Sequence, residues 1–346
     1  MTTHKIIIGN SNNMATIPDG TVNLIVTSPP YPMIEMWDEM FSRQNPDIRS
    51  ELETGNGYAA FNKMHEILNS IWKECDRVLA DNGFICINIG DATRTISNVF
   101  QLYSNHTQVI NMFLNMGYCV LPDIHWRKQS NAPNKFMGSG MLPAGAYVTY
   151  EHEYILVFRK GGKREFKGNE KSIRQKSAFF WEERNIWFSD LWEIKGTSQI
   201  IKTAKASRDR SAAFPFEIPY RLINMYSIEG DTVLDPFAGL GTTTLAAIAS
   251  KRNSIGIEID KEIASLAIKN IQDTSSKLNQ VINRRIEAHK AFIGSLSEDK
   301  KAKCYDNVPQ GYKVKTKQET SVCIDRINDV QIDGLQIECQ YESDNP

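Results

Sequence analysis

The sequence predicts an α/β fold in which helices cover both faces of a doubly wound, mostly parallel sheet. Short apolar runs alternate with amphipathic stretches of helical spacing, a pattern typical of such sheets. Two of the apolar runs end in turns rich in Gly or Pro, and open α/β sheets bind ligands at strand ends of this kind. A chain of 346 residues is long enough for one large domain of this type with an insertion.

The alternation can be followed along the chain. Amphipathic spacing predicts helices at residues 59–79, 104–116, 214–226 and 261–271. Strands are predicted at residues 22–26, 231–235 and 254–260. The Asn, Pro, Gly and Met residues over 129–145 predict a loop beside the ligand-binding strand ends, either a plain connector or a segment that grips a bound molecule. Beyond residue 277 a charged helix to 292 and an alternating tail over 311–339 have no assignable role.

The first strand end is the segment Thr27–Tyr31, here called the elbow, with the sequence TSPPY. Its two prolines fix φ at about −65° and hold the residues before them extended, so the backbone cannot close into a helix. Carbonyl oxygens there remain free to accept hydrogen bonds, Ser28 adds a hydroxyl, and Tyr31 adds a flat face. The elbow therefore suits a planar base with an exocyclic amine, and by itself it is equally typical of a proline turn with a half-buried tyrosine.

The second strand end leads from Asp231–Asp235 into residues 236–241, here called the glycine turn, and then a helical stretch. Glycines allow a ligand to approach the backbone closely. About 20 residues later the short strand over 254–260 ends in acidic residues, of which Glu258 is placed to bind ribose hydroxyls. The turn lacks the third glycine of a dinucleotide-binding turn, and Asp235 stands before it. This favours a ligand with a cationic amino group, such as S-adenosylmethionine.

Together these motifs resemble those of the DNA amino-methyltransferases, which methylate N4 of cytosine or N6 of adenine. TSPPY and DPFAGLGTT match that family in full, and TSPPY comes first, which is the circularly permuted order of the family's beta group. The chain is most similar to the N4-cytosine-specific methylases of restriction-modification systems. Further segments resemble the family's other strands and its cofactor-wrapping segment: residues 6–11, 84–91, 124–128, 151–158 and 213–219.

The resemblance implies a fold and a division of the chain. The fold is the sheet of S-adenosylmethionine-dependent methyltransferases, circularly permuted, with a DNA-recognition insertion. Its parts are a catalytic half (1–158), a target-recognition insertion (159–210), a cofactor-binding half (211–295) and a C-terminal appendage without an assigned role (296–346). The implied partner is double-stranded DNA with a specific recognition sequence, and pairing with a restriction endonuclease is implied by most relatives.

The resemblance also implies the site residues. The catalytic residues are those of the elbow, namely Ser28, Pro29, Pro30 and Tyr31. The cofactor-binding residues are Asn10, Phe214, Asp235, Phe237, Gly239, Gly241, Thr242 and Glu258. Asn10 stands where the family usually has Asp, and Asp235 is alternatively a helix N-cap. Asp260 is expected to cap the helix that follows it.

The chemistry of an aromatic amine indicates the mechanism. Its lone pair is delocalised into the ring, so acceptance of the amine protons by Ser28 Oγ and the Pro29 carbonyl would aim that lone pair at the sulfonium methyl. Transfer is then a direct displacement that depends on alignment. The base must first be flipped out of the duplex, and stacking on Tyr31, worth about 1–3 kcal/mol, offsets much of that cost. The resemblance implies no metal, and a covalent intermediate is not implied because the chain has no Pro-Cys dipeptide.

Charge and cysteines add regional information. Residues 159–210 hold 14 Lys and Arg against 7 Asp and Glu, a net of +7 in a chain of net charge −1, and aromatic residues alternate with these charges. The segment is either a DNA-contacting surface or a solvated basic surface packed by its own aromatics, and its position favours DNA. Six cysteines show no metal-binding spacing, and no apolar run is long enough for a membrane span, so we expect a cytoplasmic protein.

Three alternatives stay open from the sequence. Ser28 can accept from either amine, and only family habit favours cytosine N4 over adenine N6. A second class is a regulator that binds DNA and cofactor without methylating, against which the intact elbow argues. A third is methylation of RNA or of a protein glutamine, for which Asn-Pro-Pro-Tyr would be expected.

Overall fold

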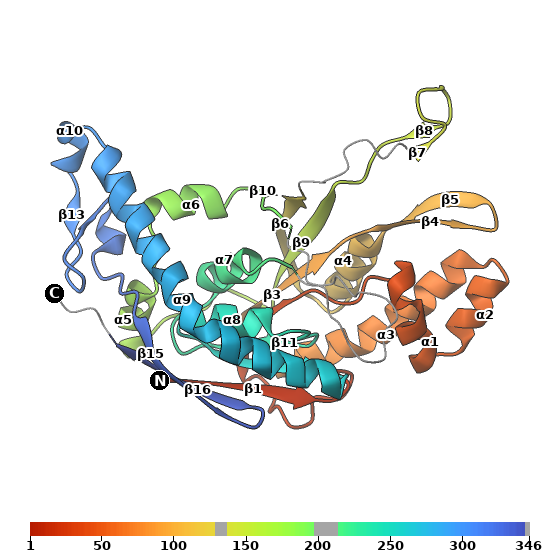
Figure 1. Cartoon of the computed structure of the whole chain (residues 1–346), viewed down its shortest axis with the longest axis horizontal. Coiled ribbons are helices and arrows are strands. Elements are labelled where there is room, and N and C mark those ends of the chain that lie inside the picture. Colours follow the sequence, from red (N-terminus) through yellow and green to blue (C-terminus); the bar gives the residue numbers. More distant parts are fainter. Residues whose placement is uncertain (129–136, 197–213, 343–346) are drawn as a thin grey trace.

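The computed structural model describes residues 1–128, 137–196 and 214–342, and one ten-stranded sheet organises them (Figure 1). The strand order is β10-β6-β9-β3-β2-β11-β12-β1-β16-β15. The bounds are β1 Thr2–Ile8, β2 Val22–Thr27, β3 Leu79–Ile89, β6 Cys119–Arg127, β9 His152–Arg159, β10 Leu191–Glu193, β11 Thr232–Asp235, β12 Asn253–Glu258, β15 Arg326–Asp333 and β16 Gln336–Glu342.

The middle of the sheet is parallel, as the sequence predicts. Strands β3, β2, β11, β12 and β1 pair in parallel, so their carboxyl ends meet at one edge, here called the carboxyl edge. Strand β9 runs antiparallel between β3 and β6, and therefore begins at that edge. Strands β15 and β16 are also antiparallel, and β16 pairs with β1. Strands β15 and β16 of the C-terminal segment thus extend the sheet beyond β1.

Helices cover both faces of the sheet. The described helices are α1 Asp38–Gln44, α2 Asp47–Glu53, α3 Gly57–Val78, α4 Asn105–Asn115, α5 Asn169–Lys176, α6 Trp181–Trp187, α7 Glu217–Tyr226, α8 Thr242–Ala249, α9 Lys261–Ser295 and α10 Glu298–Lys301, with short 3-10 helices at Glu35–Trp37 and Lys317–Glu319. Residues of α3 and α4 form one apolar core with one sheet face, and residues of α7, α8 and α9 form the other. The predicted helices at 59–79, 104–116 and 214–226 are confirmed, whereas those at 261–271 and to 292 are parts of the single helix α9.

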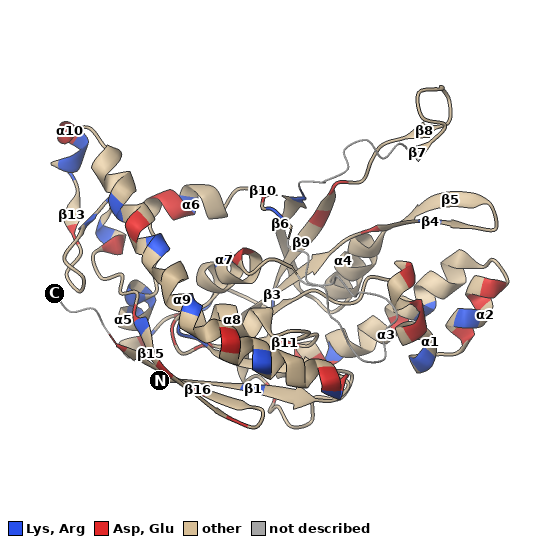
Figure 2. Cartoon of the chain, in the orientation of Figure 1, with Lys and Arg blue, Asp and Glu red and all other residues tan. Residues whose placement is uncertain are grey.

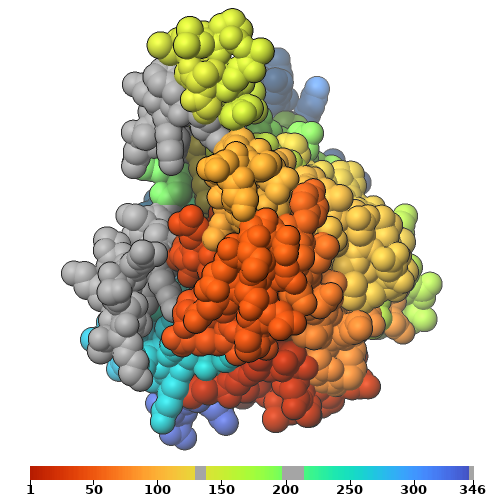
Figure 3. Space-filling model, turned by 90° about the vertical axis from the view of Figure 1, so that its right-hand side faces the viewer, coloured from red at the N-terminus to blue at the C-terminus, as the bar shows by residue number. Residues whose placement is uncertain are grey.

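Several segments surround the carboxyl edge. Helices α1 and α2 lie there with the hairpin of β4 (Ala92–Ile96) and β5 (Val99–Tyr103). A second short hairpin, β7 (Met137–Gly138) with β8 (Ala146–Tyr147), projects beyond the β4–β5 hairpin. The described part of the loop predicted over 129–145 therefore belongs to this hairpin. The first eight residues of that loop lie outside the described residues. Figure 3 views this side, with the β7–β8 hairpin in yellow above the orange β4–β5 hairpin.

Several aromatic residues of the predicted recognition insertion are buried. Strand β10 pairs with β6 and extends the sheet. Phe180 and Trp192 are buried in the core at 0% and 1% exposure, and Trp187, at 7% exposure, packs against the buried ring of Tyr220. These three aromatic rings therefore stabilise the fold and are not available to stack on DNA. Residues 197–210 of the insertion, which hold part of its positive charge, lie outside the described residues.

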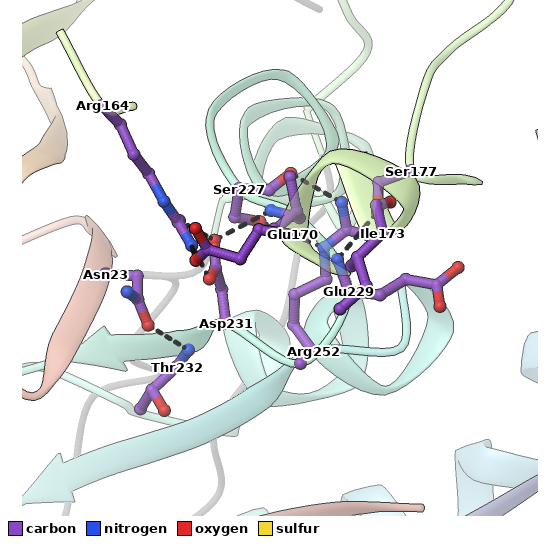
Figure 4. Close-up of polar contacts among 12 residues, drawn as sticks. Asn23, Arg164, Glu170, Ile173, Ser177, Ser227, Glu229, Asp231, Thr232 and Arg252 are labelled. Atoms are coloured by element: carbon purple, nitrogen blue, oxygen red, sulfur yellow. Dashed lines mark hydrogen bonds and ion pairs between the residues drawn. The ribbon is translucent and has the colours of Figure 1, made fainter. Parts of the chain in front are cut away.

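The first part of the insertion lies at the opposite edge of the sheet, which we call the amino edge. Arg164 donates to both oxygens of Asp231, at 3.0 and 2.8 Å, immediately before β11, and to Glu170 of α5 at 3.0 Å (Figure 4). Ser177 Oγ accepts from the Glu229 backbone at 2.9 Å. These contacts hold residues 164–177 to the amino ends of the central strands.

In the part of the chain that the structure describes, no helix is both long and apolar enough to cross a membrane.

Candidate active site

The elbow and the glycine turn lie side by side at the carboxyl edge. Strands β2 and β11 pair in parallel, with Leu24 opposite Val233 and Ile25 opposite Leu234. At their ends Thr27 Oγ1 donates to Asp235 Oδ1 at 2.6 Å, across 208 residues of sequence. The predicted adjacency of the two strand ends is confirmed, since a parallel pair brings equivalent ends to one edge.

Asp235 is buried beneath the turn, with 3% of its surface exposed. One carboxylate oxygen accepts from Thr27 and from the Phe237 backbone N–H at 3.0 Å, and the other accepts from Thr243 Oγ1 of α8 at 2.6 Å. Burial raises the pKa of Asp235, although the three hydrogen bonds act in the opposite direction. The carboxylate is thus committed to fixing the elbow, the turn and α8 to one another.

A cavity of about 480 Å³ lies between the two motifs. Ser28 and Pro30 of the elbow line it, together with Phe237 and Gly239 of the glycine turn. Its apolar wall comes from the helices α1 and α3 and includes Met40, Phe41, Ile67, Leu68 and Ile71. A concave, largely apolar site of this size with a few polar groups is typical of small-molecule binding.

Glu258 and Asn10 supply polar groups to this cavity. Glu258 accepts from the backbone N–H of Gly239 at 3.0 Å and of Asp260 at 2.9 Å, so it ties the end of β12 to the glycine turn. Burial raises the pKa of Glu258. Asn10 Oδ1 accepts from Asn12 N at 3.1 Å, and its Nδ2 donates to Gln44 of α1 at 3.2 Å.

Not every predicted site residue reaches the cavity. Six of the predicted residues line the cavity: Asn10, Ser28, Pro30, Phe237, Gly239 and Glu258. The other six are not in its lining: Pro29, Tyr31, Phe214, Asp235, Gly241 and Thr242.

The residues outside the lining have other placements. Phe214 packs in the core. Gly241 is the N-cap of α8 with φ of 76°, and a Cβ there would lie 3.1 Å from Ile271. Asp260 caps α9 as predicted, because its side chain accepts from the backbone of Glu262 and Ile263.

Tyr31 belongs to a polar network beside the cavity. Its hydroxyl donates to Glu153 Oε2 at 2.9 Å and lies 3.0 Å from Ser28 Oγ. Asn88 Nδ2 donates to Tyr31 Oη at 2.8 Å and to Glu153 Oε2 at 2.7 Å. Lys128 forms an ion pair with Glu153 Oε1. Burial, followed by the charge of Glu153, raises the pKa of Tyr31 well above its ordinary value.

Sequence reasoning missed Asn88, Lys128 and Glu153 as site residues. The available signal was a polar residue at the carboxyl-edge end of a strand: Asn88 interrupts the apolar run of β3, and Glu153 is the second residue of β9. Glu153 lies near the elbow because β9 runs antiparallel to β3, which brings the start of β9, rather than its end, to the carboxyl edge.

The basic residues of α5 and the segment before it lie away from this site. Figure 2 shows blue segments on α5 at the end of the molecule opposite the β4–β5 hairpin. Lys163, Lys167 and Lys171 are exposed there, near the Arg164–Asp231 ion pair of the amino edge. We therefore expect the DNA-contacting role predicted for the insertion not to involve these lysines.

Neutralising these three lysines together, as Lys163→Gln, Lys167→Gln and Lys171→Gln, is expected to leave DNA affinity unchanged within about twofold. The dependence of affinity on salt should also stay the same, because that slope counts phosphate contacts. Titration of a fluorescent duplex at several salt concentrations measures both quantities. A clearly shallower salt slope would return the amino edge to the DNA interface.

Comparison with known proteins agrees with this geometry. The model of the N6/N4 family, described as DNA methylase, matches residues 22–269. The chain is 52% identical over 324 residues to the type II methyltransferase M.MthZI of Methanothermobacter thermautotrophicus, covering 93% of this chain and 90% of that protein. It is 49% identical to the type II methyltransferase M.MjaI of Methanocaldococcus jannaschii, covering 82% of this chain and 95% of that one.

Solved structures agree as well. TTHA0409 of Thermus thermophilus, complexed with S-adenosyl-L-methionine, is 28% identical with a TM-score of 0.59, over 78% of this chain and 93% of that one. The cytosine-N4-specific PvuII methyltransferase has a TM-score of 0.53 at 19% identity, a likeness of fold. The predicted fold, the family resemblance and the predicted cofactor, S-adenosylmethionine, are confirmed. The chain belongs to the N6/N4 DNA methylase family.

Proposed function

We propose that this chain is a site-specific, cytosine-N4 DNA methyltransferase and the modification part of a restriction-modification system. The observation that carries the proposal is the shared cavity: Ser28 of the elbow and Gly239 of the glycine turn line the same space. A cofactor in that space and a base at the elbow would be in contact. The type II methyltransferases to which the chain is similar support the restriction-modification role.

The cavity residues fit S-adenosylmethionine. The apolar wall of α1 and α3 suits the adenine ring, and the half-buried carboxylate of Glu258 retains free lone pairs for ribose hydroxyls. Asn10 would face the adenine, and the backbone of Phe237 and Gly239 would hold the methionine end. When bound, this cofactor supplies an electrophilic methyl group.

The chain's own residues orient the target amine. Ser28 Oγ accepts one amine proton and the Pro29 carbonyl accepts the other, which leaves the nitrogen lone pair directed toward the methyl group. Tyr31 stacks on the flipped base and so offsets part of the cost of removing it from the duplex. These interactions strengthen as the nitrogen becomes tetrahedral, so they favour the transition state over the bound base.

The identity of the target base decides between two possible products. Ser28 accepts from an exocyclic amine, a group shared by cytosine and adenine, and N6-adenine methylation is the alternative function. The serine of the elbow, in a family whose N4-cytosine members mostly have serine there, favours cytosine.

Nucleoside mass spectrometry of DNA from a host that expresses the chain tests the proposal. We expect N4-methylcytosine in that DNA and far less of it in a host that expresses Ser28→Ala to the same level. N6-methyladenine would replace the proposed base by the alternative, and neither nucleoside would overturn the proposal. Sequencing of the modified positions then gives the recognised sequence.

A further inference from the structure

A chain of hydrogen bonds connects Ser28 at the cavity to Glu153 behind it. Ser28 Oγ lies 3.0 Å from Tyr31 Oη, and Tyr31 Oη lies 2.9 Å from Glu153 Oε2. The close packing of Gly90 supports this arrangement, because a Cβ there would lie 3.1 Å from the Tyr31 ring and 3.2 Å from Glu153 Cγ. The hydroxyl group that faces the cavity is therefore connected to a carboxylate that does not line it.

The direction of the first bond follows from the donors around Glu153. Its Oε2 accepts from Asn88 Nδ2 at 2.7 Å, and its Oε1 is paired with the Lys128 ammonium. A carboxyl group surrounded by these donors acts only as an acceptor, so the single hydroxyl proton of Tyr31 is donated to Glu153. The buried Tyr31 hydroxyl also keeps this proton, since its pKa is raised well above the ordinary value.

The direction of the second bond follows from the first. Tyr31 Oη has no further proton, and Asn88 already donates to it at 2.8 Å. The 3.0 Å contact between Ser28 and Tyr31 is therefore a hydrogen bond that Ser28 donates. Asn88 Nδ2 lies 3.4 Å from Ser28 Oγ, and both of its hydrogens have closer acceptors in Tyr31 and Glu153. Ser28 Oγ is left with its lone pairs free and no proton to offer the cavity.

We propose that Glu153, acting through Tyr31, is a positioning residue that makes Ser28 an obligate hydrogen-bond acceptor and thereby selects bases with an exocyclic amine against bases with a keto group. This rests on the proposed function, in which Ser28 receives an amine proton. An amine N–H finds a lone pair at Ser28, whereas a keto oxygen at the same position meets another acceptor. A buried pair of acceptors without a proton between them is unfavourable.

The variant Tyr31→Phe tests the proposal, because it keeps the stacking ring and removes the hydroxyl that receives the Ser28 proton. The Ser28 hydroxyl is then free to rotate and to donate. We measure binding of duplexes that carry the recognised sequence with either dC or dU at the target position, in the presence of S-adenosylhomocysteine. The ratio of the two Kd values is compared between wild type and variant, so the weaker pairing of dU with dG cancels.

In the variant the preference for dC over dU is expected to fall about tenfold, on the scale of one unpaired polar group. The single-turnover rate on dC should fall by about 10- to 100-fold while the Kd for dC DNA changes by less than about threefold. A dC to dU ratio that stays within about twofold of wild type would overturn the proposal, even if the variant were slow.

Glu153→Gln gives an independent measurement and a cycle. A glutamine amide at this position can donate to Tyr31 Oη, which reverses the bond, so the preference should fall as in Tyr31→Phe. The double variant should show no further fall, because both changes interrupt one chain of bonds. Additive effects of the two substitutions would contradict the connection through Tyr31.

Tyr118→Phe is the matched control. Tyr118 donates to Asp76 Oδ1 at 2.8 Å, where α3 ends and β6 is about to begin, and so has a comparable bond to a carboxylate away from the site. This variant should leave both the base preference and the transfer rate unchanged. If DNA analysis finds N6-methyladenine, the same comparison is made with dA and hypoxanthine, so an error in the target base is distinguishable from a failure of this proposal.

Discussion

Replacing Ser28 with alanine is expected to slow methyl transfer by about 100-fold or more while DNA affinity changes by less than about threefold. The variant loses the side-chain acceptor for the target amine, and removal of one such preorganised group costs about 10²–10³ in rate. Pro30 and Tyr31 remain to hold the base, so binding should persist. Single-turnover assays with labelled S-adenosylmethionine measure the rate, and titration of a fluorescent duplex measures the affinity.

Ser275→Ala is the matched control for this experiment. Ser275 lies on α9, and its hydroxyl donates within its own helix, to Gln272 O at 3.2 Å. This variant should retain the wild-type rate. A wild-type rate in Ser28→Ala itself would mean that another group orients the amine.

Replacing Asp235 with alanine is expected to reduce the free energy of unfolding by about 3 kcal/mol, because hydrogen bonds to a charged group contribute about 1.5–3 kcal/mol and buried donors lose their acceptor. Three donors converge on this carboxylate: the hydroxyls of Thr27 and Thr243 and the N–H of Phe237. Chemical denaturation measures the loss. Asp235→Asn, which retains an acceptor of the same shape, should lose less.

The Asp235→Asn variant also separates two roles for this residue. The sequence predicted a carboxylate near the methionine amino group, whereas the structure commits the carboxylate to the elbow, the turn and α8. We therefore expect folded Asp235→Asn to bind S-adenosylmethionine within about threefold of wild type in calorimetric titration, a difference below about 1 kcal/mol. A loss of more than about tenfold in the folded variant would restore direct contact with the cofactor.

The parts that the sequence predicts well are those in which chemistry and spacing agree locally. TSPPY and the glycine turn each follow a short apolar strand, and parallel pairing leaves their ends only one edge at which to meet. Glu258 follows from the same reasoning, because it ends the neighbouring strand. Helices α3 and α4 were predicted because their apolar residues recur at helical spacing.

The parts that the sequence does not predict depend on pairings across long stretches of chain. The role of Glu153 depends on β9 running antiparallel to β3, and the hairpin of β15 and β16 is placed by the pairing of Thr2 with Cys339. Composition alone could not show that the first part of the basic insertion lies at the amino edge of the sheet. That placement depends on the ion pair of Arg164 with Asp231. Helix α1 contributes to the cavity wall without any motif of its own.

The most direct test of the central claim follows the methyl group with purified protein. DNA is incubated with the chain and S-adenosylmethionine carrying a deuterated methyl group, then digested to nucleosides and analysed by mass spectrometry. We predict that the label is found on an exocyclic amine, as N4-methylcytosine, and that Ser28→Ala yields about a hundredth of it at early times. Label at C5 of cytosine, or DNA without label under conditions in which the protein binds both ligands, would contradict the account.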